Sequence, residues 1–118
     1  IRDAQESRGL GDVYKRQQIT DTNFEALLAE GKPMIVDFWA TWCGPCQLVG
    51  PMIDELATEY DGRIIVGKVD VDSNQDLPAQ FRVRNIPTIL FIKNGEVQNK
   101  LVGAQSKATL IAEAEKLL

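Results

Sequence analysis

The sequence predicts an α/β fold in which a mixed β-sheet carries helices on both faces. Short apolar runs rich in β-branched and aromatic residues alternate with amphipathic helical patterns. The first two runs, at residues 34–39 and 64–71, are separated by a helical pattern, which predicts a βαβ unit with parallel strands. A third run, at residues 88–93, is followed by Asn94-Gly95, a strong signal for an antiparallel hairpin.

The composition indicates one small globular domain. The chain has 118 residues, of which 44% are hydrophobic and 25% charged, as expected for one domain with one core. Its net charge of −4 argues against a nucleic-acid partner. No apolar run approaches the roughly 18 residues of a membrane span, so we expect no membrane partner. The first residues lack the apolar stretch of a secretory signal, so we predict a cytoplasmic location.

Two residue counts exclude whole classes of chemistry. The chain has no histidine, so Ser–His and Cys–His nucleophilic catalysis cannot be built. It has two cysteines, whereas a structural zinc site normally needs four Cys or His ligands. A zinc site would therefore need carboxylate ligands or a second chain, and we expect no bound metal.

The first seventeen residues differ from the rest of the chain. They show no sustained periodicity, and residues 12–17 (Asp-Val-Tyr-Lys-Arg-Gln) resemble a translated sequencing-library adapter. We interpret residues 1–17 as a non-native or disordered segment, assign it no function, and place the domain at residues 18–118. A further strand is expected before Thr20, at this junction, where foreign residues truncate or rebuild it.

The first half of the domain alternates helix and strand. Thr20-Asp21 offers an N-cap to a helix that ends before Pro33. Residues 34–39 are apolar and β-branched, which predicts a strand buried on both faces. A helical pattern follows over residues 46–60, with Pro51 expected to kink it, and Asp61-Gly62 ends it.

The second half begins with the strand at residues 64–71. A polar turn at residues 72–76 and a short helix at residues 77–81 follow. Pro87 opens the strand at residues 88–93, and the strand at residues 96–102 returns antiparallel to it. Ser106 is expected to cap a final helix with an apolar stripe.

The motif that carries chemistry is Trp42-Cys43-Gly44-Pro45-Cys46, between a buried strand and a helix. We expect Cys43 at the helix N-terminus with its sulfur exposed, because the free N–H groups and the helix dipole favour a reactive thiolate there. Gly44 allows a tight turn, and Pro45 suits the first helical turn. Cys46 lies one turn further, less exposed but within reach of Cys43.

This placement predicts dithiol–disulfide exchange. Cys43 attacks a target disulfide to form a mixed disulfide, and Cys46 then attacks Cys43 and releases the reduced target. A purely structural disulfide is the alternative. Closing so short a loop stabilises a fold by only about 2 kcal/mol, which argues against it, and a CxxC pair beside a βαβ pattern favours a redox role.

Residues 37–46 (Asp-Phe-Trp-Ala-Thr-Trp-Cys-Gly-Pro-Cys) resemble the active-site signature of the thioredoxin family. Ile86-Pro87-Thr88, Lys93-Asn94-Gly95 and Val102-Gly103 resemble the family's later motifs in the same order, and the resemblance covers about residues 19–118. It implies a five-stranded mixed sheet in the order 1-3-2-4-5 flanked by four helices. One departure is Gln47, where the family often has Lys or Arg.

The resemblance also implies an activity. It is that of a thiol-disulfide oxidoreductase, a general protein-disulfide reductase without a bound cofactor. The implied electron source is NADPH through thioredoxin reductase, and the other implied partners are disulfide-containing substrate proteins. We expect the chain to act as a monomer.

Asp37 is a charged residue in an otherwise apolar strand. If the strand is half-exposed, the carboxylate faces solvent. If it is buried, its pKa rises, and it can accept the proton of Cys46, a role that the resemblance supports. The resemblance pairs Asp37 with Lys68, whose alternative role is a solvated charge at a strand end.

The resemblance further implies a surface that binds substrate. It makes the Ile86–Pro87 bond cis and places it beside the cysteines, so that the Ile86 backbone meets an extended substrate segment. The predicted substrate-binding residues are Trp42, Gly44, Pro45, Ile86, Pro87, Gly103 and Ala104. Ordinary packing or turn formation is the alternative for each of them, and Trp39 is expected to support the loop by packing.

Other functions stay open at this point. A disulfide oxidase or isomerase is disfavoured because such relatives usually carry His between the cysteines. A binding or scaffolding subunit of the same fold would keep its function when both Cys43 and Cys46 are replaced by serine. A metal-binding CxxC protein would retain metal after purification in reducing buffer.

Overall fold

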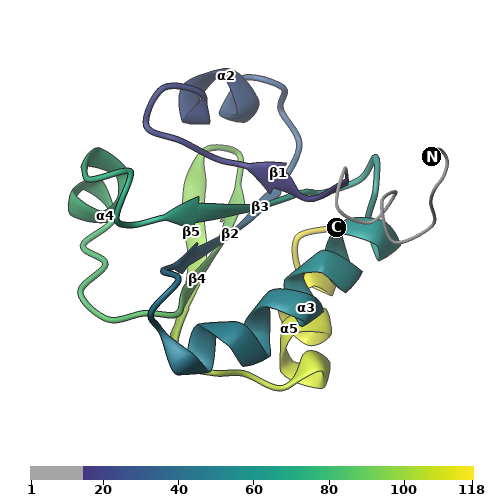
Figure 1. Ribbon diagram of the computed structural model, residues 1–118. Helices are drawn as coiled ribbons and strands as arrows, with labels where there is room; N and C mark the ends of the chain where they lie inside the picture. The colour runs from purple at the N-terminus through teal and green to yellow at the C-terminus, as the bar shows by residue number, and fades with distance from the viewer. Residues whose placement is uncertain (1–14) are drawn as a thin grey trace, which may run out of the picture.

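The computed structural model describes residues 15–118 and shows one five-stranded sheet (Figure 1). Its strands are β1 (Gln17–Gln18), β2 (Met34–Trp39), β3 (Ile65–Asp70), β4 (Thr88–Lys93) and β5 (Glu96–Val102). They lie in the order β1-β3-β2-β4-β5. Strands β1 and β2 run parallel to β3, whereas β4 is antiparallel to both β2 and β5. The predicted mixed sheet and its strand order are therefore confirmed.

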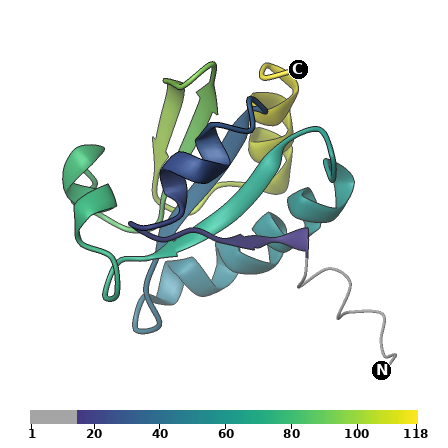
Figure 2. The ribbon, with the colours of Figure 1, turned by 90° about the horizontal axis from the view of Figure 1, so that it is seen from above.

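Helices cover both faces of this sheet (Figures 1 and 2). Within residues 15–118 they are α2 (Phe24–Leu28), α3 (Gly44–Glu59), α4 (Asp76–Gln80) and α5 (Lys107–Glu115). Side chains alternate between the two faces along each strand, so the central strands β2, β3 and β4 each supply buried residues to two separate cores. In this part of the chain, no helix combines the length and the apolar character needed to cross a bilayer.

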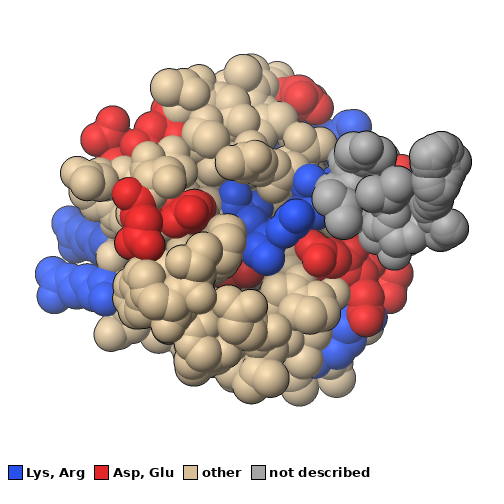
Figure 3. Space-filling view, in the orientation of Figure 1, with Lys and Arg blue, Asp and Glu red and all other residues tan. Residues whose placement is uncertain are grey.

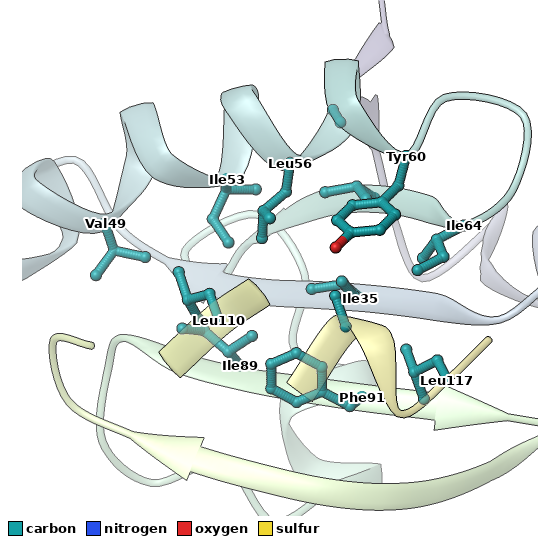
Figure 4. Close-up of a cluster of buried hydrophobic side chains, with 13 residues drawn as sticks. Ile35, Val49, Ile53, Leu56, Tyr60, Ile64, Ile89, Phe91, Leu110 and Leu117 are labelled. Carbon is teal, nitrogen blue, oxygen red and sulfur yellow. The ribbon is translucent and has the colours of Figure 1, made fainter. Parts of the chain in front are cut away.

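The larger core lies between the sheet and the helices α3 and α5 (Figure 4). Ile35, Ile89 and Phe91 point from the sheet toward Ile53 of α3 and Leu110 of α5, and all five are almost wholly buried. On the opposite face, apolar side chains of the sheet pack against α2 and α4. Burying a large aliphatic or aromatic side chain contributes roughly 1.5–3 kcal/mol, so the first of these cores holds α3 firmly on the sheet.

Local sequence signals fix three of the element ends. Asn94 and Gly95 have φ values of 55° and 78°, the left-handed pair that a two-residue hairpin turn needs. Ser106 caps α5, since its hydroxyl accepts a hydrogen bond from the backbone N–H of Thr109 at 3.1 Å. Strands β2, β4 and β5 have the predicted bounds, whereas α3 begins two residues earlier than predicted and includes Pro51.

The predicted cap before α2 is present at Thr20, whereas Asp21 has another role. Thr20 Oγ1 accepts a hydrogen bond from the Asn23 backbone N–H at 3.2 Å, in the turn that leads into α2. The Asp21 carboxylate instead accepts hydrogen bonds from the backbone N–H groups of Asp76 (3.1 Å) and Leu77 (2.9 Å), in the first turn of α4. Asp21 therefore ties the loop before α2 to a helix far along the chain, a contact that no local pattern reveals.

Strand β1 lies close against β3 because β3 carries a glycine there. Gln17 pairs with Gly67 and Gln18 with Lys68. A Cβ on Gly67 would lie 2.5 Å from Ile19 Cδ1 and 2.8 Å from the Gln17 carbonyl oxygen, so any larger residue would push β1 away. The predicted first strand is present, and it includes Gln17, which the sequence had assigned to the foreign segment. Residues 1–14 of that segment lie outside the described residues.

Candidate active site

The two cysteines form a disulfide at the start of α3. Their Cα atoms are 5.3 Å apart. Cys43 is the N-cap residue of α3, and its Sγ accepts a hydrogen bond from the Cys46 backbone N–H at 3.2 Å. Pro45 lies in the first turn, which contains no acidic residue to oppose the helix dipole. The predicted position of Cys43 at the helix N-terminus, within reach of Cys46, is confirmed.

The exposure predicted for Cys43 is wrong for this disulfide form. Cys43 is 5% exposed and Cys46 3%. The Cys43 sulfur lies against the first turn of α3, in a small apolar cluster that includes Ala40 and borders Ile86. The neighbouring residues Trp42, Gly44 and Pro45 are exposed, so the sulfurs lie just beneath a rim that a partner can reach.

A loop with a cis-proline lies against Cys43. The Ile86–Pro87 bond is cis, as expected, and the Ile86 carbonyl oxygen is 3.7 Å from Cys43 Sγ. The Gly103 backbone N–H donates a hydrogen bond to the Pro87 carbonyl at 2.8 Å, which brings the end of β5 to the same loop. Pro87 itself is buried, whereas Ala104 is exposed.

Trp42 is held in place by a residue that the sequence analysis missed. Its indole Nε1 donates a hydrogen bond to Asp72 Oδ2 at 2.9 Å, while the side chain stays largely exposed. Asp72 belonged to a segment predicted only as a polar turn. Gln47 donates to the Thr41 carbonyl at 3.4 Å, so the residue that departs from the family pattern bonds to the active-site loop.

Asp37 lies inside the protein. Residues alternate along β2, so Asp37 points to the same face as Ile35, toward α3. It is fully buried, and neither carboxylate oxygen has a hydrogen-bond partner within residues 15–118. Desolvation raises the pKa of Asp37 to about 7; Lys68 and Arg16 oppose the rise, and Asp54 adds to it. The alternative in which Asp37 faces solvent is wrong.

Lys68 lies next to Asp37 across the parallel pair of β2 and β3. Its Nζ is 4.8 Å from the centre of the Trp39 ring and 3.1 Å from where a Cβ on Gly50 of α3 would stand. Burial lowers the pKa of Lys68, as does Arg16, while Asp37 and Asp54 raise it. Because Lys68 is half-buried among these groups, its alternative as a freely solvated charge at a strand end is wrong.

Two further charged residues, Arg16 and Asp54, lie close to Asp37 and Lys68, and the four form a charged cluster. Arg16 Nε is 3.4 Å from Asp54 Oδ1, and Arg16 lines a surface hollow together with Lys68 and Trp39. Figure 3 shows basic groups in a hollow near the centre of this face, beside acidic groups. The sequence analysis missed Asp54, an unremarked position of α3, and Arg16, which it placed in the foreign segment.

Comparisons with known proteins agree with this architecture. The family model described as Thioredoxin matches residues 15–116. The thioredoxin of Haemophilus influenzae is 50% identical over 93 residues, which cover 78% of this chain and 87% of the relative. The thioredoxin of Pseudomonas aeruginosa is 47% identical over 96 residues, covering 80% and 88%.

A chloroplast protein is also similar. The chloroplastic M-type thioredoxin of spinach is 46% identical over 107 residues, which cover 90% of this chain and 59% of the relative. The chain thus spans less than two thirds of that relative's length. The family match contains the whole sheet, both cysteines and the cis-proline loop, so this chain belongs to the thioredoxin family.

Proposed function

We propose that this chain is a general reductase of disulfide bonds in other proteins. The observation that carries the proposal is the Cys43–Cys46 disulfide at the N-terminus of α3, with the Ile86 carbonyl oxygen 3.7 Å from Cys43 Sγ. The hydrogen bond from the Cys46 N–H and the helix dipole both stabilise negative charge on the Cys43 sulfur. Cys43 is therefore the nucleophile, and Cys46 the residue that resolves the mixed disulfide.

The reaction starts from the reduced form of the pair. The Cys43 thiolate attacks one sulfur of a target disulfide, the target bond breaks, and its other sulfur leaves as a thiolate. The Cys46 thiolate then attacks Cys43 Sγ, and the second target sulfur leaves. The chain ends in the disulfide form that the structure shows, and two electrons have passed to the target.

Asp37 supplies the proton acceptor for the second attack in this proposal. Its carboxyl group faces α3, whose first turn holds Cys46, and its pKa of about 7 suits proton transfer near neutral pH. Lys68, beside it in the sheet, favours the ionised carboxylate. The transfer runs directly or through a bound water.

Substrate contact is proposed at the rim around the sulfurs. The proposed contact residues are the exposed Trp42, Gly44, Pro45 and Ala104 and the half-buried Ile86 and Gly103. The Ile86 carbonyl approaches Cys43 Sγ, and Gly103 bonds to the Pro87 carbonyl, which support this placement. An extended target segment binds along the Ile86 backbone, as in the addition of a β-strand. Pro87 shapes this loop from beneath.

Thioredoxin reductase, fed by NADPH, is the proposed electron donor, and the chain acts as a monomer without a bound cofactor. The cytoplasm is the proposed compartment, since the dithiol must be kept reduced. The relative from spinach is named as chloroplastic, which makes the chloroplast the alternative compartment.

The test is NADPH-coupled reduction of insulin by the full chain, with a bacterial-type thioredoxin reductase. We expect NADPH oxidation and insulin reduction that depend on the chain. The Cys43→Ser, Cys46→Ser double variant is the matched control and should be inactive. Absence of insulin reduction by the reduced wild-type chain, with dithiothreitol in place of the reductase, would contradict the proposed function.

A further inference from the structure

The cluster behind the disulfide contains a charge from outside the predicted domain. Arg16 immediately precedes β1, which pairs with β3 at Gly67 and Lys68. The pairing carries Arg16 to the side of α3 that bears Asp54, and its Nε lies 3.4 Å from Asp54 Oδ1. Both side chains are partly buried, with 26% and 32% of their surface exposed. Partial burial reduces screening by solvent, so this pair acts more strongly than an open surface pair.

The groups around Asp37 come from every element that packs against it. Lys68 lies beside it on β3, and Ile89 of β4, which carries no charge, lies on its other side. Asp54, on α3, the helix that also holds Cys46, pairs with Arg16, and Arg16 lines one surface hollow with Lys68. An ion pair, a strand pair and a shared hollow thus link two carboxylates and two cations, and the two Asp37 oxygens lack hydrogen bonds from the described residues.

We propose that Arg16, held in place by its ion pair with Asp54, is a positioning residue whose positive charge favours the ionised form of Asp37, ready to accept the Cys46 proton. The inference rests on the proposed role of Asp37 in the second step. Without Arg16, Lys68 is the remaining cation of this group that favours ionisation of Asp37, while Asp54 opposes it. A guanidinium suits this place because its planar set of N–H donors matches a carboxylate.

The effects of these charges on the pKa of Asp37 agree with this arrangement. Arg16 lowers the pKa of Asp37, whereas Asp54 raises it. Removing the guanidinium therefore loses an attraction and leaves the repulsion from Asp54 in place. This loss moves ionisation of Asp37, and hence deprotonation of Cys46, to higher pH.

The first experiment measures ionisation of Asp37 without catalysis. In the oxidised chain neither cysteine titrates, so the ¹³C signal of the Asp37 carboxyl reports its charged neighbours alone. Arg16→Gln should raise the titration midpoint by about half a pH unit, a modest shift for a partly exposed charge. Arg16→Lys should restore most of the wild-type midpoint.

Lys15→Gln is the matched control, because it removes the same charge from the adjacent, exposed residue. It should leave the Asp37 midpoint unchanged. Equal shifts in the Lys15 and Arg16 variants, or no shift in Arg16→Gln, would overturn the proposal. In an Asp54→Asn background, Arg16→Gln should shift the Asp37 midpoint less, because Arg16 has already lost its partner. An undiminished shift would show that Asp54 does not hold Arg16 in place.

The second experiment follows the rate at which the mixed disulfide is resolved, as a function of pH. On the acidic side of this profile, the pH at which the rate is half-maximal should rise in Arg16→Gln by the same amount as the Asp37 midpoint. If the Asp37 midpoint rises and the rate profile does not change, the proposed part of Arg16 in the reaction is wrong. Failure of the proposed function would appear separately, as loss of insulin reduction by the wild-type chain.

Discussion

Cys46→Ser is expected to stop turnover and to trap a covalent complex between Cys43 and the target protein. Cys43 keeps its position as the N-cap of α3 and can still attack a target disulfide. No second sulfur is then available to release the target. NADPH-coupled insulin reduction should fall more than about 100-fold, as is typical when one member of a catalytic unit is removed. Non-reducing gels and peptide mapping should show the complex.

Cys43→Ser is the matched control for this trap. The remaining Cys46 is 3% exposed and lies within the first turn of α3, so it should form no complex with the target. If Cys43→Ser forms a complex through Cys46 as readily as Cys46→Ser does through Cys43, the assignment of Cys43 as the attacking cysteine is wrong. Retained turnover in Cys46→Ser would remove the need for a resolving cysteine.

Asp37→Asn is expected to stabilise the oxidised protein at alkaline pH. Burial raises the pKa of Asp37 from 3.8 to about 7, so above pH 7 the folded state must hold a buried anion. This penalty, roughly 4 kcal/mol when complete, grows as pH rises from about 4 to 7 and stays constant above. The unpaired Asn amide cancels part of the gain, which leaves an increase of about 2–4 kcal/mol at pH 8.5.

Urea unfolding of the oxidised chain at several pH values measures this difference. The gain should shrink as pH falls from about 7 toward 4 and be lost below pH 3.8, the unfolded-state pKa, where Asp37 becomes protonated in both folded and unfolded states. Asp61→Asn, at an exposed position, is the matched control and should change stability little at any pH. A gain that does not depend on pH would show that packing, rather than charge, explains it.

The same variant should be slower in the second chemical step. Removing a positioned proton acceptor typically costs about 10²-fold or more. The deficit should be largest near pH 7 and should narrow toward pH 9, where the Cys46 thiol ionises without help. Single-turnover insulin reduction across pH 6 to 9 measures this step, and an unchanged rate would rule out the role of Asp37.

The sequence predicted those parts of the fold that local patterns encode. Strands β2 and β4 are nearly continuous apolar runs, and Asn94-Gly95 strongly favours a two-residue hairpin turn. The predicted bounds of β2, β4 and β5 were therefore correct. The active-site motif was found because two thiols at CxxC spacing follow a buried strand. The burial of Asp37 was expected because a lone carboxylate interrupts an apolar strand.

The parts that were missed depend on contacts between distant segments. Asp21 caps α4 rather than α2, and Asp72 binds Trp42 across a turn that looked merely polar. Cys43 has low exposure because Ala40, Cys46 and the loop at Ile86 pack around it, and a short stretch of sequence does not reveal this packing. Arg16 was set aside because its segment looked foreign, although the pairing of β1 with β3 carries it to Asp54.

The central claim is that the N-terminus of α3 makes Cys43 the reactive thiolate. The most direct measurement is alkylation of the fully reduced chain by iodoacetamide over a range of pH, with each modified cysteine identified by peptide mapping. Cys43 should react first, and its rate should be half-maximal well below pH 8.5, the pKa of a free cysteine thiol. A midpoint at or above pH 8.5, or faster modification of Cys46, would contradict the account.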